Sequence, residues 1–339
     1  MKVTSQCAVV TGGAGFIGSH LVERLLQDGH RVRVLDDLSR GRLENLASVS
    51  HNPSFSFQRA SLSDGKRLKD VFTGADWVFH LAALADIVPS VAEPQTYHAC
   101  NVDATVAALE AARAAGVKRF LYAASSSCYG IPDIFPTPET APMRPLYPYA
   151  LTKNVAEQYV LHWAKVYGLP CLSLRLFNVY GPRSRTTGAY GAVFGVFLAQ
   201  KLANKPFTIV GDGKQTRDFT FVTDVAEAFA LAAQSDLSGE ALNVGSGGTY
   251  SINDLVKLLG GGQTVHLPKR PGEPDCTFAD TGKIERALGW RPKVGFPEGV
   301  RRLLGLLEQW RDAPVWDEKT IGEATKEWFT LLGKRDADG

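Results

Sequence analysis

Short apolar runs alternate with amphipathic segments along the first half of the chain. The runs have the length of buried strands, and the segments between them repeat apolar residues at helical spacing, as Leu21, Val22 and Leu25 do. The predicted strands are 8–10, 31–35, 55–58, 75–81, 118–123 and 171–177, and the main predicted helices are 66–72, 94–115 and 149–163. This alternation predicts a doubly wound parallel α/β sheet with right-handed crossovers.

The pattern changes after residue 181, where a polar, glycine-bearing loop (184–191) precedes a predicted helix (192–205) and a short strand (208–211). Helix 222–233 and strand 241–244 are expected to return to the main sheet. Further helices are predicted from Ile252, from Asp280 and over 297–310. We therefore predict two interleaved domains: a Rossmann-type domain of residues 1–181 with a return segment at about 220–248, and a smaller α/β domain of residues 182–219 and 249–339.

A glycine-rich turn, Thr11-Gly12-Gly13-Ala14-Gly15-Phe16-Ile17-Gly18, follows the first predicted strand and opens a helix. Glycines let a pyrophosphate approach the backbone, and the N-terminus of the helix favours an anion. Asp36 ends the second strand at about the twenty-residue interval expected of a carboxylate that binds an adenosine ribose. Such a carboxylate repels a 2′-phosphate, so NAD is predicted over NADP, a preference that Arg40 and Arg42 temper.

Tyr149 and Lys153 lie four residues apart, and therefore on one face of the predicted helix. A nearby ammonium favours an ionised phenol, and a positive nicotinamide ring adds to this, so we expect Tyr149 to be deprotonated near neutral pH. It would then act as a general base toward an alcohol while hydride leaves the same carbon. A solvated helix face is the alternative for such a pair by itself; the glycine turn and the serine cluster 125–127 favour the catalytic interpretation.

Composition narrows the class of protein. The chain has 339 residues, 45% of them hydrophobic and 21% charged, with a net charge of +2, so neither nucleic acid nor an acidic membrane is an expected partner. The five cysteines show no metal-ligand spacing; no metal is expected, and the cysteines suit a reducing compartment. A predicted core strand begins almost at the N-terminus, leaving no room for a signal peptide, and no apolar run has membrane-spanning length. We expect a cytoplasmic protein.

Together these motifs resemble the extended short-chain dehydrogenase/reductase family, specifically its nucleotide-sugar epimerases. The resemblance covers nearly the whole chain and implies an NAD-binding first domain, a second domain that binds a UDP-sugar, and a homodimer formed through helices 94–115 and 149–167. It rests on the glycine turn, Asp36, Ser125-Ser126-Ser127, Tyr149 with Lys153, Arg175-Leu176-Phe177-Asn178-Val179-Tyr180-Gly181-Pro182-Arg183, and Thr216-Arg217-Asp218-Phe219.

The resemblance also implies individual roles. Tyr149 would be the base, Lys153 would hold the nicotinamide ribose and tune Tyr149, and Ser125 would hydrogen-bond the reacting hydroxyl. The implied NAD-binding residues are Gly12, Gly15, Phe16, Ile17, Gly18, Asp36, Asp37, Ser39, Gly41, Leu62, Leu81, Ala82, Ala83, Ala85, Tyr149 and Lys153. The chain departs from many relatives at Ser61-Leu62, where they carry an Asp-Ile or Asp-Leu pair for the adenine.

The substrate side follows from the same resemblance. Asn178 would contact the diphosphate, and Arg217 and Arg270 would neutralise it, because a guanidinium bonds phosphate oxygens in pairs. A surface salt bridge with Asp218 is the alternative for Arg217. The implied substrate-binding residues are Ser126, Ser127, Asn178, Arg217, Arg270, Glu273 and Thr277.

The serine cluster selects among the family's reactions. Dehydratases of dTDP-sugars carry Asp-Glu where this chain has Ser126 and Ser127, and decarboxylases of UDP-glucuronate carry glutamate at the position of Ser127. Because this chain lacks that acid, the family reaction that remains is removal of hydride from C4 and its return to C4. The 4-keto sugar turns its other face between the two steps.

Thr277, just before Phe278-Ala279-Asp280, stands where the resemblance places a bulky tyrosine in relatives restricted to plain hexoses. The smaller threonine leaves room for an N-acetyl group. This favours a UDP-GlcNAc/UDP-GalNAc 4-epimerase, with UDP-Glc/UDP-Gal as further candidate substrates. Gly188-Ala189-Tyr190 also resembles the N-acetylhexosamine epimerases. The alternatives are a UDP-glucuronate 4-epimerase, with Arg185 meeting the carboxylate, another nucleotide-sugar enzyme of the family such as a decarboxylase or dehydratase, and, from a different class, a non-catalytic NAD-binding sensor.

Overall fold

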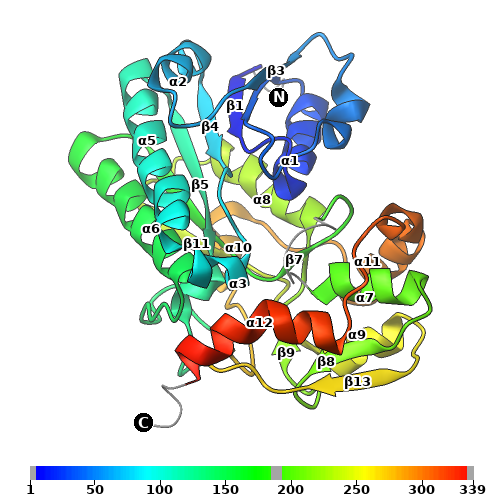
Figure 1. The fold of residues 1–339 in the computed structure, drawn as a ribbon. Helices are drawn as coiled ribbons and strands as arrows, with labels where there is room; N and C mark the ends of the chain where they lie inside the picture. Colours follow the sequence, from blue (N-terminus) through cyan, green and yellow to red (C-terminus); the bar gives the residue numbers. More distant parts are fainter. Residues whose placement is uncertain (1–4, 185–192, 334–339) are drawn as a thin grey trace.

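A parallel sheet forms the centre of the computed structural model, which describes residues 5–184 and 193–333 (Figure 1). The sheet has seven strands in the order β11-β6-β5-β4-β1-β2-β3, and every neighbouring pair is parallel. Its strands are β1 (Cys7–Thr11), β2 (Arg31–Asp36), β3 (Phe55–Arg59), β4 (Trp77–His80), β5 (Arg119–Ser125), β6 (Cys171–Leu176) and β11 (Glu240–Val244). The predicted Rossmann-type fold class is confirmed.

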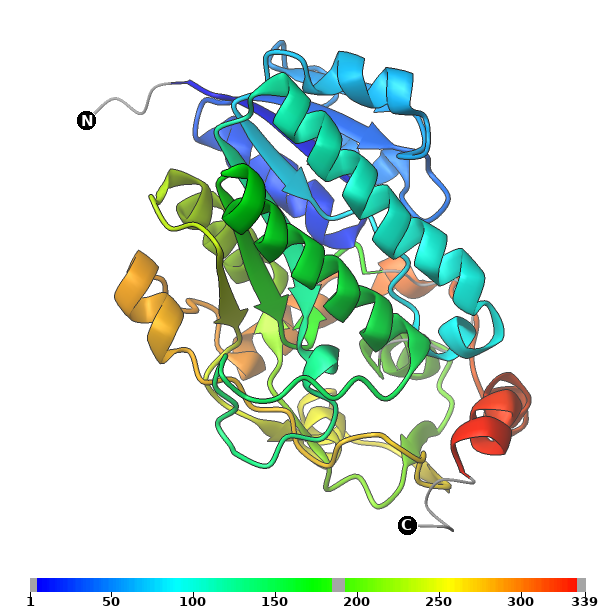
Figure 2. The ribbon, with the colours of Figure 1, turned by 90° about the vertical axis from the view of Figure 1, so that its left-hand side faces the viewer.

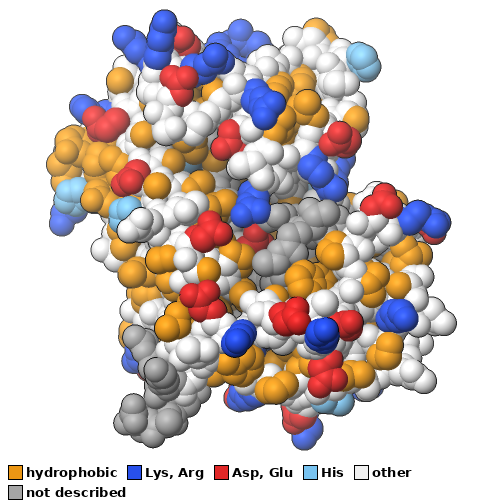
Figure 3. Space-filling model, viewed as in Figure 1, with side chains coloured by type: hydrophobic (Ala, Val, Ile, Leu, Met, Phe, Trp, Pro, Cys, Tyr) orange, Lys and Arg blue, Asp and Glu red, His pale blue; other side chains and the backbone are white. Residues whose placement is uncertain are grey.

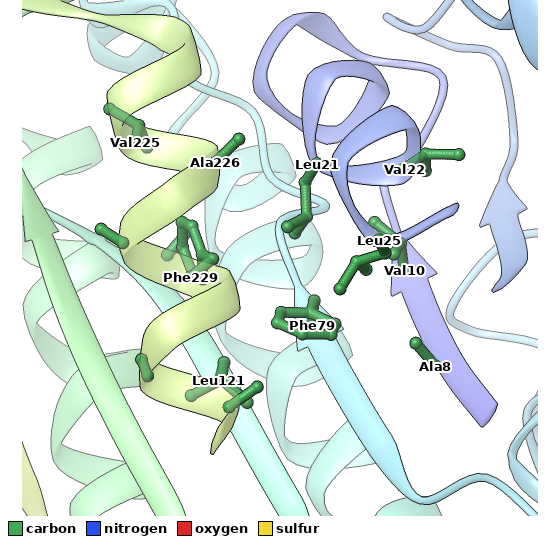
Figure 4. Packing of buried hydrophobic residues seen from close by; sticks show 14 of the residues in the cluster. Ala8, Val10, Leu21, Val22, Leu25, Phe79, Leu121, Val225, Ala226 and Phe229 are labelled. Carbon is green, nitrogen blue, oxygen red and sulfur yellow. The ribbon is translucent and has the colours of Figure 1, made fainter. Parts of the chain in front are cut away.

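Helices cover both faces of this sheet. On one face lie α2 (Gly65–Phe72), α5 (Ala104–Ala115) and α6 (Pro148–Tyr167), of which α5 and α6 run side by side in Figure 2. On the other, α1 (Phe16–Gln27) packs against α8 (Val222–Gln234). Figure 4 shows Leu21 and Leu25 of α1 and Phe229 of α8 directed toward Phe79 of β4, all of them buried. Burial of these apolar faces holds the two layers on the sheet.

The strand order reverses between β1 and β4. From β1 the next strands, β2 and β3, extend to one edge of the sheet, and from β4 the later strands extend to the other edge. At such a switch point the loops after neighbouring strands diverge and leave a crevice at the carboxyl ends of the strands. The glycine turn follows β1 and residues 81–85 follow β4, so both border this crevice. The Gly12 N–H, donating to the carbonyl of Leu35 (2.9 Å), fixes the turn onto β2.

The smaller part of the molecule is built around a second buried cluster rich in aromatic residues, in which the rings of Phe219 and Phe296 stack at 4.7 Å. It contains three two-stranded sheets. Their strands are β7 (Val179–Tyr180) with β10 (Thr220–Phe221), β8 (Phe207–Val210) with β13 (Thr264–Leu267), and β9 (Thr216–Arg217) with β12 (Tyr250–Ser251). The helices are α7 (Val193–Leu202), α9 (Ile252–Leu258) and α11 (Phe296–Leu304). α10 (Gly282–Leu288) instead packs against β11, and its Ile284 belongs to the buried cluster of the main sheet. The division into two domains with the stated boundaries stays a prediction.

Several elements differ from the sequence-based prediction. The expected single helix 94–115 is divided into α4 (Pro94–His98), a π-helical turn (Ala99–Asp103) and α5. The prediction missed α3 (Ile87–Ala92), β13 and a C-terminal helix, α12 (Glu318–Leu332), and the helix expected over 297–310 ends earlier, as α11. Short 3-10 segments are Leu43–Val49, Ser126–Tyr129 and Leu307–Trp310.

Two further expectations concern the sugar-binding residues at 185–190 and a membrane-spanning segment. Arg185 and Gly188-Ala189-Tyr190 lie outside the described residues. Within the described ranges, none of the helices combines the length and the apolar character that a membrane crossing requires.

Candidate active site

A single cavity of about 1030 Å³ runs along the carboxyl ends of the central strands and into the smaller part of the molecule. Within the described ranges, every residue that the sequence analysis assigned to the cofactor, the substrate or the chemistry lies on the wall of this cavity, from Gly12 to Thr277. Residues from the glycine turn after β1, from β2, β5 and α6, and from the smaller sheets are thus brought together. The contact that each makes with a ligand stays a prediction.

The glycine turn fits a pyrophosphate. Gly12 has a φ of +71°, and a Cβ added there would lie 2.7 Å from the backbone nitrogen of Ala82. A Cβ on Gly18 would lie 2.2 Å from the carbonyl oxygen of Gly12, whereas one on Gly15 would meet only that oxygen, at 3.1 Å, beside the cavity. No side chain caps α1, so its first N–H groups are available to an anion.

These distances predict different outcomes for two similar substitutions. Gly18→Ala should lower the free energy of unfolding by about 1–3 kcal/mol, the usual cost of overpacking, because its methyl group meets backbone. Gly15→Ala should leave stability nearly unchanged and weaken NAD binding, because its methyl group occupies space beside the turn. Urea unfolding and NAD titration measure the two effects. Equal loss of stability in both variants would contradict this account of the turn.

Asp36 is held rigidly at the cavity wall. Its carboxylate is 7% exposed and accepts hydrogen bonds from the N–H groups of Ala14 (3.0 Å) and Leu38 (2.9 Å). Burial raises the pKa of this carboxyl, and the two N–H donors act in the opposite direction. Gly41 lies so close that a Cβ there would come within 2.8 Å of the carboxylate. The carboxylate is therefore preorganised to accept from ribose hydroxyls.

The Tyr149 phenol lies at the start of α6, beside Ser125 at the end of β5, and both line the cavity. Burial raises the pKa of Tyr149 to about 12, although its hydrogen bond with Ser125 acts to lower it. The protein's own groups therefore keep the phenol protonated near neutral pH, and its ionisation with NAD bound stays a prediction. The sequence showed the spacing of Tyr149 and Lys153 but not how completely the fold would desolvate the phenol.

Lys153, one turn along α6, is buried at 4% exposure. Its ammonium lies 4.3 Å from the ring centroid of Tyr122, a contact that favours the charged form. Burial nevertheless lowers the pKa of Lys153 to about 8, against the nearby charge of Glu157, which acts to raise it. Lys153 therefore sits close to its titration point at physiological pH.

Behind Lys153 lies a buried ion pair. The Arg175 side chain of β6 donates to the Glu157 carboxylate from Nη2 (2.6 Å) and Nε (3.0 Å), and Ser173 donates to the same carboxylate (2.7 Å). Arg175 Nη1 also donates to the hydroxyl of Tyr129 (2.8 Å). Burial by itself would lower the pKa of Arg175, but Glu157 raises it. This network fixes α6, and with it the position of Lys153, against the sheet.

The substrate side carries two arginines that share one carboxylate. Arg217 pairs with Glu273 at 2.8 Å, and Arg270 lies 3.7 Å from the same carboxylate. The alternative of a surface pair between Arg217 and Asp218 is wrong, because Arg217 is buried and Asp218 instead accepts from Ser246. Both guanidinium groups line the cavity, and a guanidinium bonds phosphate oxygens in pairs, so this corner of the cavity suits an anion.

Thr277 and Asn178 form a linked pair near these arginines. The Thr277 hydroxyl donates to the side-chain oxygen of Asn178 (2.7 Å) and accepts from the N–H of Asp218 (3.1 Å). Its small side chain faces the cavity.

Sequence reasoning missed many further lining residues, among them Val88 in α3, Tyr147 just before α6, and Trp316 and Trp328 from the C-terminal segment. The sequence does contain a signal for the helix that carries Trp328. Ile321, Thr325 and Trp328 have helical spacing, and Asp317 with Thr320 forms a capping box at the start of α12.

The sequence profile of the NAD dependent epimerase/dehydratase family matches residues 8–245, which include the glycine turn, Asp36, the serine cluster and the Tyr149–Lys153 pair. The chain belongs to this family. Its members use NAD, and the cradle described above fits that cofactor, so NAD is the cofactor of this protein.

Relatives in the family cover nearly the whole chain. A UDP-glucose 4-epimerase of Mycolicibacterium smegmatis is 39% identical over 306 residues, which are 87% of this chain and 96% of the relative. The solved structure of a UDP-N-acetylglucosamine 4-epimerase from Methanobrevibacter ruminantium M1, in complex with UDP-N-acetylmuramic acid, has a TM-score of 0.86 at 34% identity and covers 91% of this chain and all of its own.

A third similar protein was solved with the cofactor bound. The UDP-glucuronic acid 4-epimerase of Bacillus cereus, solved with UDP-glucuronic acid and NAD, has a TM-score of 0.83 at 32% identity and covers 89% of this chain and 99% of its own. The family member described here is thus similar to NAD-dependent nucleotide-sugar 4-epimerases that differ in their sugar.

Proposed function

We propose that the protein catalyses the reversible C4 epimerisation of UDP-GlcNAc and UDP-GalNAc, with UDP-Glc and UDP-Gal as further candidate substrates. The observation that carries this proposal is that Tyr149, Ser125 and Lys153 line one cavity together with the glycine turn and the two arginines. A UDP-sugar with its diphosphate at Arg217 and Arg270 would extend its hexose toward Tyr149.

When bound, NAD would supply a reversible hydride acceptor for C4, and its positive ring would favour loss of the Tyr149 proton. The Tyr149 oxygen takes the proton of the C4 hydroxyl and gives it back at the end. Ser125 orients that hydroxyl, and the Lys153 ammonium stabilises the phenolate. The buried setting strengthens each of these interactions, because solvent screening is weak there.

The surroundings of Ser125 support epimerisation over elimination. Ser127 and Ser125 are linked through their hydroxyls (2.7 Å), and Ser126 lies between them, so the positions that would need an acid for dehydration or decarboxylation carry neutral hydroxyls. A hydroxyl with an ordinary pKa cannot take or give a proton efficiently near neutral pH. Return of the hydride is then the remaining course for the 4-keto sugar.

Thr277 supports the choice of the N-acetylated sugars, because its side chain is small and its hydroxyl is hydrogen-bonded to Asn178 and Asp218. UDP-glucuronate is the second candidate, favoured by the likeness to the Bacillus cereus enzyme. A protein of a different class, a non-catalytic NAD sensor, is the remaining alternative. The presence of Tyr149, Lys153 and Ser125 together in the cavity argues against it.

The test follows the anomeric protons of each UDP-sugar by NMR in the presence of purified protein. Equilibration of UDP-GlcNAc with UDP-GalNAc is the expected result. Turnover of UDP-glucuronate alone would overturn the sugar assignment, and release of CO₂ or of a 4-keto-6-deoxy sugar would overturn the reaction. Binding of UDP-sugars with no turnover of any would favour the sensor.

The pKa of Lys153 predicts how activity depends on pH. Because burial lowers that pKa to about 8, the ammonium is fully charged below pH 7 and is lost as the pH rises through 8. We expect kcat/KM for UDP-GlcNAc to fall above about pH 8. A profile that stays flat to pH 10 would contradict the proposed role of the charge on Lys153.

The proposed assembly is a homodimer. Tyr159, Val166 and Tyr167 of α6 remain exposed (between 39% and 53%), and hydrophobic side chains gather in Figure 3 along the edge where α5 and α6 lie in Figure 1. Light scattering after size-exclusion chromatography measures this state. We further propose a cytoplasmic location, from the cysteine usage alone.

A further inference from the structure

A buried histidine that the proposed chemistry does not use lies at the end of β4. The side chain of His80 is fully buried, and its ring stacks on that of Tyr122, with 5.9 Å between the ring centroids. Burial lowers the pKa of His80 to about 3, and the nearby charge of Lys153 acts in the same direction. The imidazole is therefore neutral, so one ring nitrogen donates a hydrogen bond and the other accepts one.

Both ring nitrogens of His80 have partners on neighbouring elements. Nδ1 lies 2.8 Å from the hydroxyl of Thr11, the last residue of β1, and Nε2 lies 3.0 Å from the hydroxyl of Thr105 in α5. Thr105 donates its own proton to the carbonyl of Asn101 (2.6 Å), so its oxygen accepts from the Nε2–H group. Nδ1 then accepts from Thr11, and these partners select a single tautomer of the ring.

The chain of hydrogen bonds continues from Asn101, in the π-helical turn, to two further segments. Asn101 accepts from the N–H of Leu84 (2.8 Å) and donates to the carbonyl of the same residue (3.0 Å). Its side-chain amide also donates to the hydroxyl of Thr152 (3.0 Å) in α6. The Thr152 hydroxyl in turn donates to the carbonyl of Tyr149 (2.9 Å). The network thus reaches the first turn of α6.

This network connects the predicted cofactor side of the cavity with the helix that carries Tyr149. On the first side it holds the end of β1, directly before the glycine turn, and both ends of segment 80–84, of which residues 81–84 line the cavity. On the second side it holds Thr152, the residue before Lys153. Its five side chains, each at most 4% exposed, are those of Thr11, His80, Asn101, Thr105 and Thr152. Loss of one member therefore leaves buried polar groups without a partner.

We propose that His80 is a positioning residue for the epimerisation, because its network sets the distance between the NAD-binding wall and the Tyr149 phenol. The reaction needs C4 of the sugar to face the cofactor while the C4 hydroxyl faces Tyr149, so the two surfaces must keep a fixed separation. His80 acts from behind the cavity lining, to which its own side chain does not belong. This inference rests on the proposed function, which places the reacting groups on those two surfaces.

The first test measures turnover and NAD affinity in variants of the full-length protein. His80→Phe keeps a ring but removes both hydrogen bonds, and kcat for UDP-GlcNAc should fall about 10–100-fold, the order expected for a small misplacement of reacting groups. KM for UDP-GlcNAc should change by less than about threefold, because the arginines lie outside the network. NAD affinity, measured by calorimetry, should fall about tenfold. His80→Gln, whose amide can donate toward Thr105, should recover part of kcat.

A cycle of single and double substitutions tests the coupling along the network. Thr152→Val removes the hydroxyl at the α6 end with little change in shape and should also lower kcat. If both side chains act through one network, the double variant should lose no more kcat than His80→Phe alone. Thr325→Val is the matched control, because Thr325 is a buried threonine (2% exposed) whose hydroxyl donates within α12 to the carbonyl of Ile321 (2.8 Å). It should leave kcat unchanged.

Three outcomes overturn the proposal. They are a folded His80→Phe protein with unchanged kcat, losses that multiply in the double variant, and an equal loss of kcat in Thr325→Val. If His80→Phe does not fold, Thr105→Val breaks the same network and should show the same selective fall in kcat. The proposed function fails separately, by absence of turnover in the unsubstituted protein. NAD affinity then decides the present inference, which an unchanged affinity in His80→Phe would refute.

Discussion

Tyr149→Phe is expected to lower kcat for epimerisation of UDP-GlcNAc by about 10²–10⁴-fold, the range that a positioned general acid–base group contributes. The substitution removes only the phenolic oxygen, which lies beside Ser125 on the cavity wall. Ring packing at the start of α6 is retained. The affinities for NAD and for UDP-GlcNAc should therefore change by less than about threefold, because neither depends mainly on this oxygen.

Ser125→Ala is the companion variant. It removes the hydroxyl that orients the substrate and bonds Tyr149, but leaves the proton acceptor in place, so its loss of kcat should be the smaller of the two. Turnover is measured by NMR and affinity by calorimetry. A Tyr149→Phe protein with more than a tenth of the original kcat would show that another group moves the proton.

The second large effect concerns stability. Glu157→Ala is expected to lower the free energy of unfolding by about 3–5 kcal/mol, because it leaves the Arg175 guanidinium buried without its counter-charge. Arg175 is 7% exposed and Glu157 is 3% exposed at the side chain, so water cannot replace the lost partner. Denaturant unfolding of the two proteins measures the difference. Glu157 also supports the charge of Lys153, so the fall in activity at high pH should begin at lower pH in this variant.

A matched control separates burial from charge. Glu298→Ala removes an exposed carboxylate of α11 that pairs with Arg302 (2.9 Å), and solvent screening should make its effect on stability small. Glu157→Leu combined with Arg175→Met removes both charges and should recover much of the loss. If the single and double variants are equally unstable, the cost arises from lost packing and not from an unpaired charge.

The central sheet could be predicted because the sequence patterns that define its strands and helices are local. Each strand is an apolar run of the right length, and each intervening helix shows one apolar face. The missed elements depend on long-range contacts. α3 is only six residues long, and β13 is a half-exposed strand defined by its pairing with β8. The π-helical turn at Ala99–Asp103 has no signature in residue periodicity.

The cavity lining could be predicted in part from short motifs, whereas the partners and protonation states of the lining residues could not. Glycine spacing and the Tyr149–Lys153 interval are short motifs, so the sequence displays them directly. The partner of Arg217 is not local, because Glu273 is 56 positions away and only the fold brings the two within 2.8 Å. Desolvation of Tyr149 likewise depends on every segment that packs around it, and Trp328 reaches the cavity from a helix near the end of the described chain.

The strand β11 has a consequence for synthesis of the chain on the ribosome. It completes the sheet by pairing with β6, yet it is made only after β7, α7, β8, β9 and β10 of the smaller part, and α8, which covers the sheet beside α1, comes just before it. Until residue 244 has left the exit tunnel, β6 is an unprotected edge, open to pairing with another nascent polypeptide. Chaperone dependence should therefore be greatest for truncated translation products that end between β6 and β11.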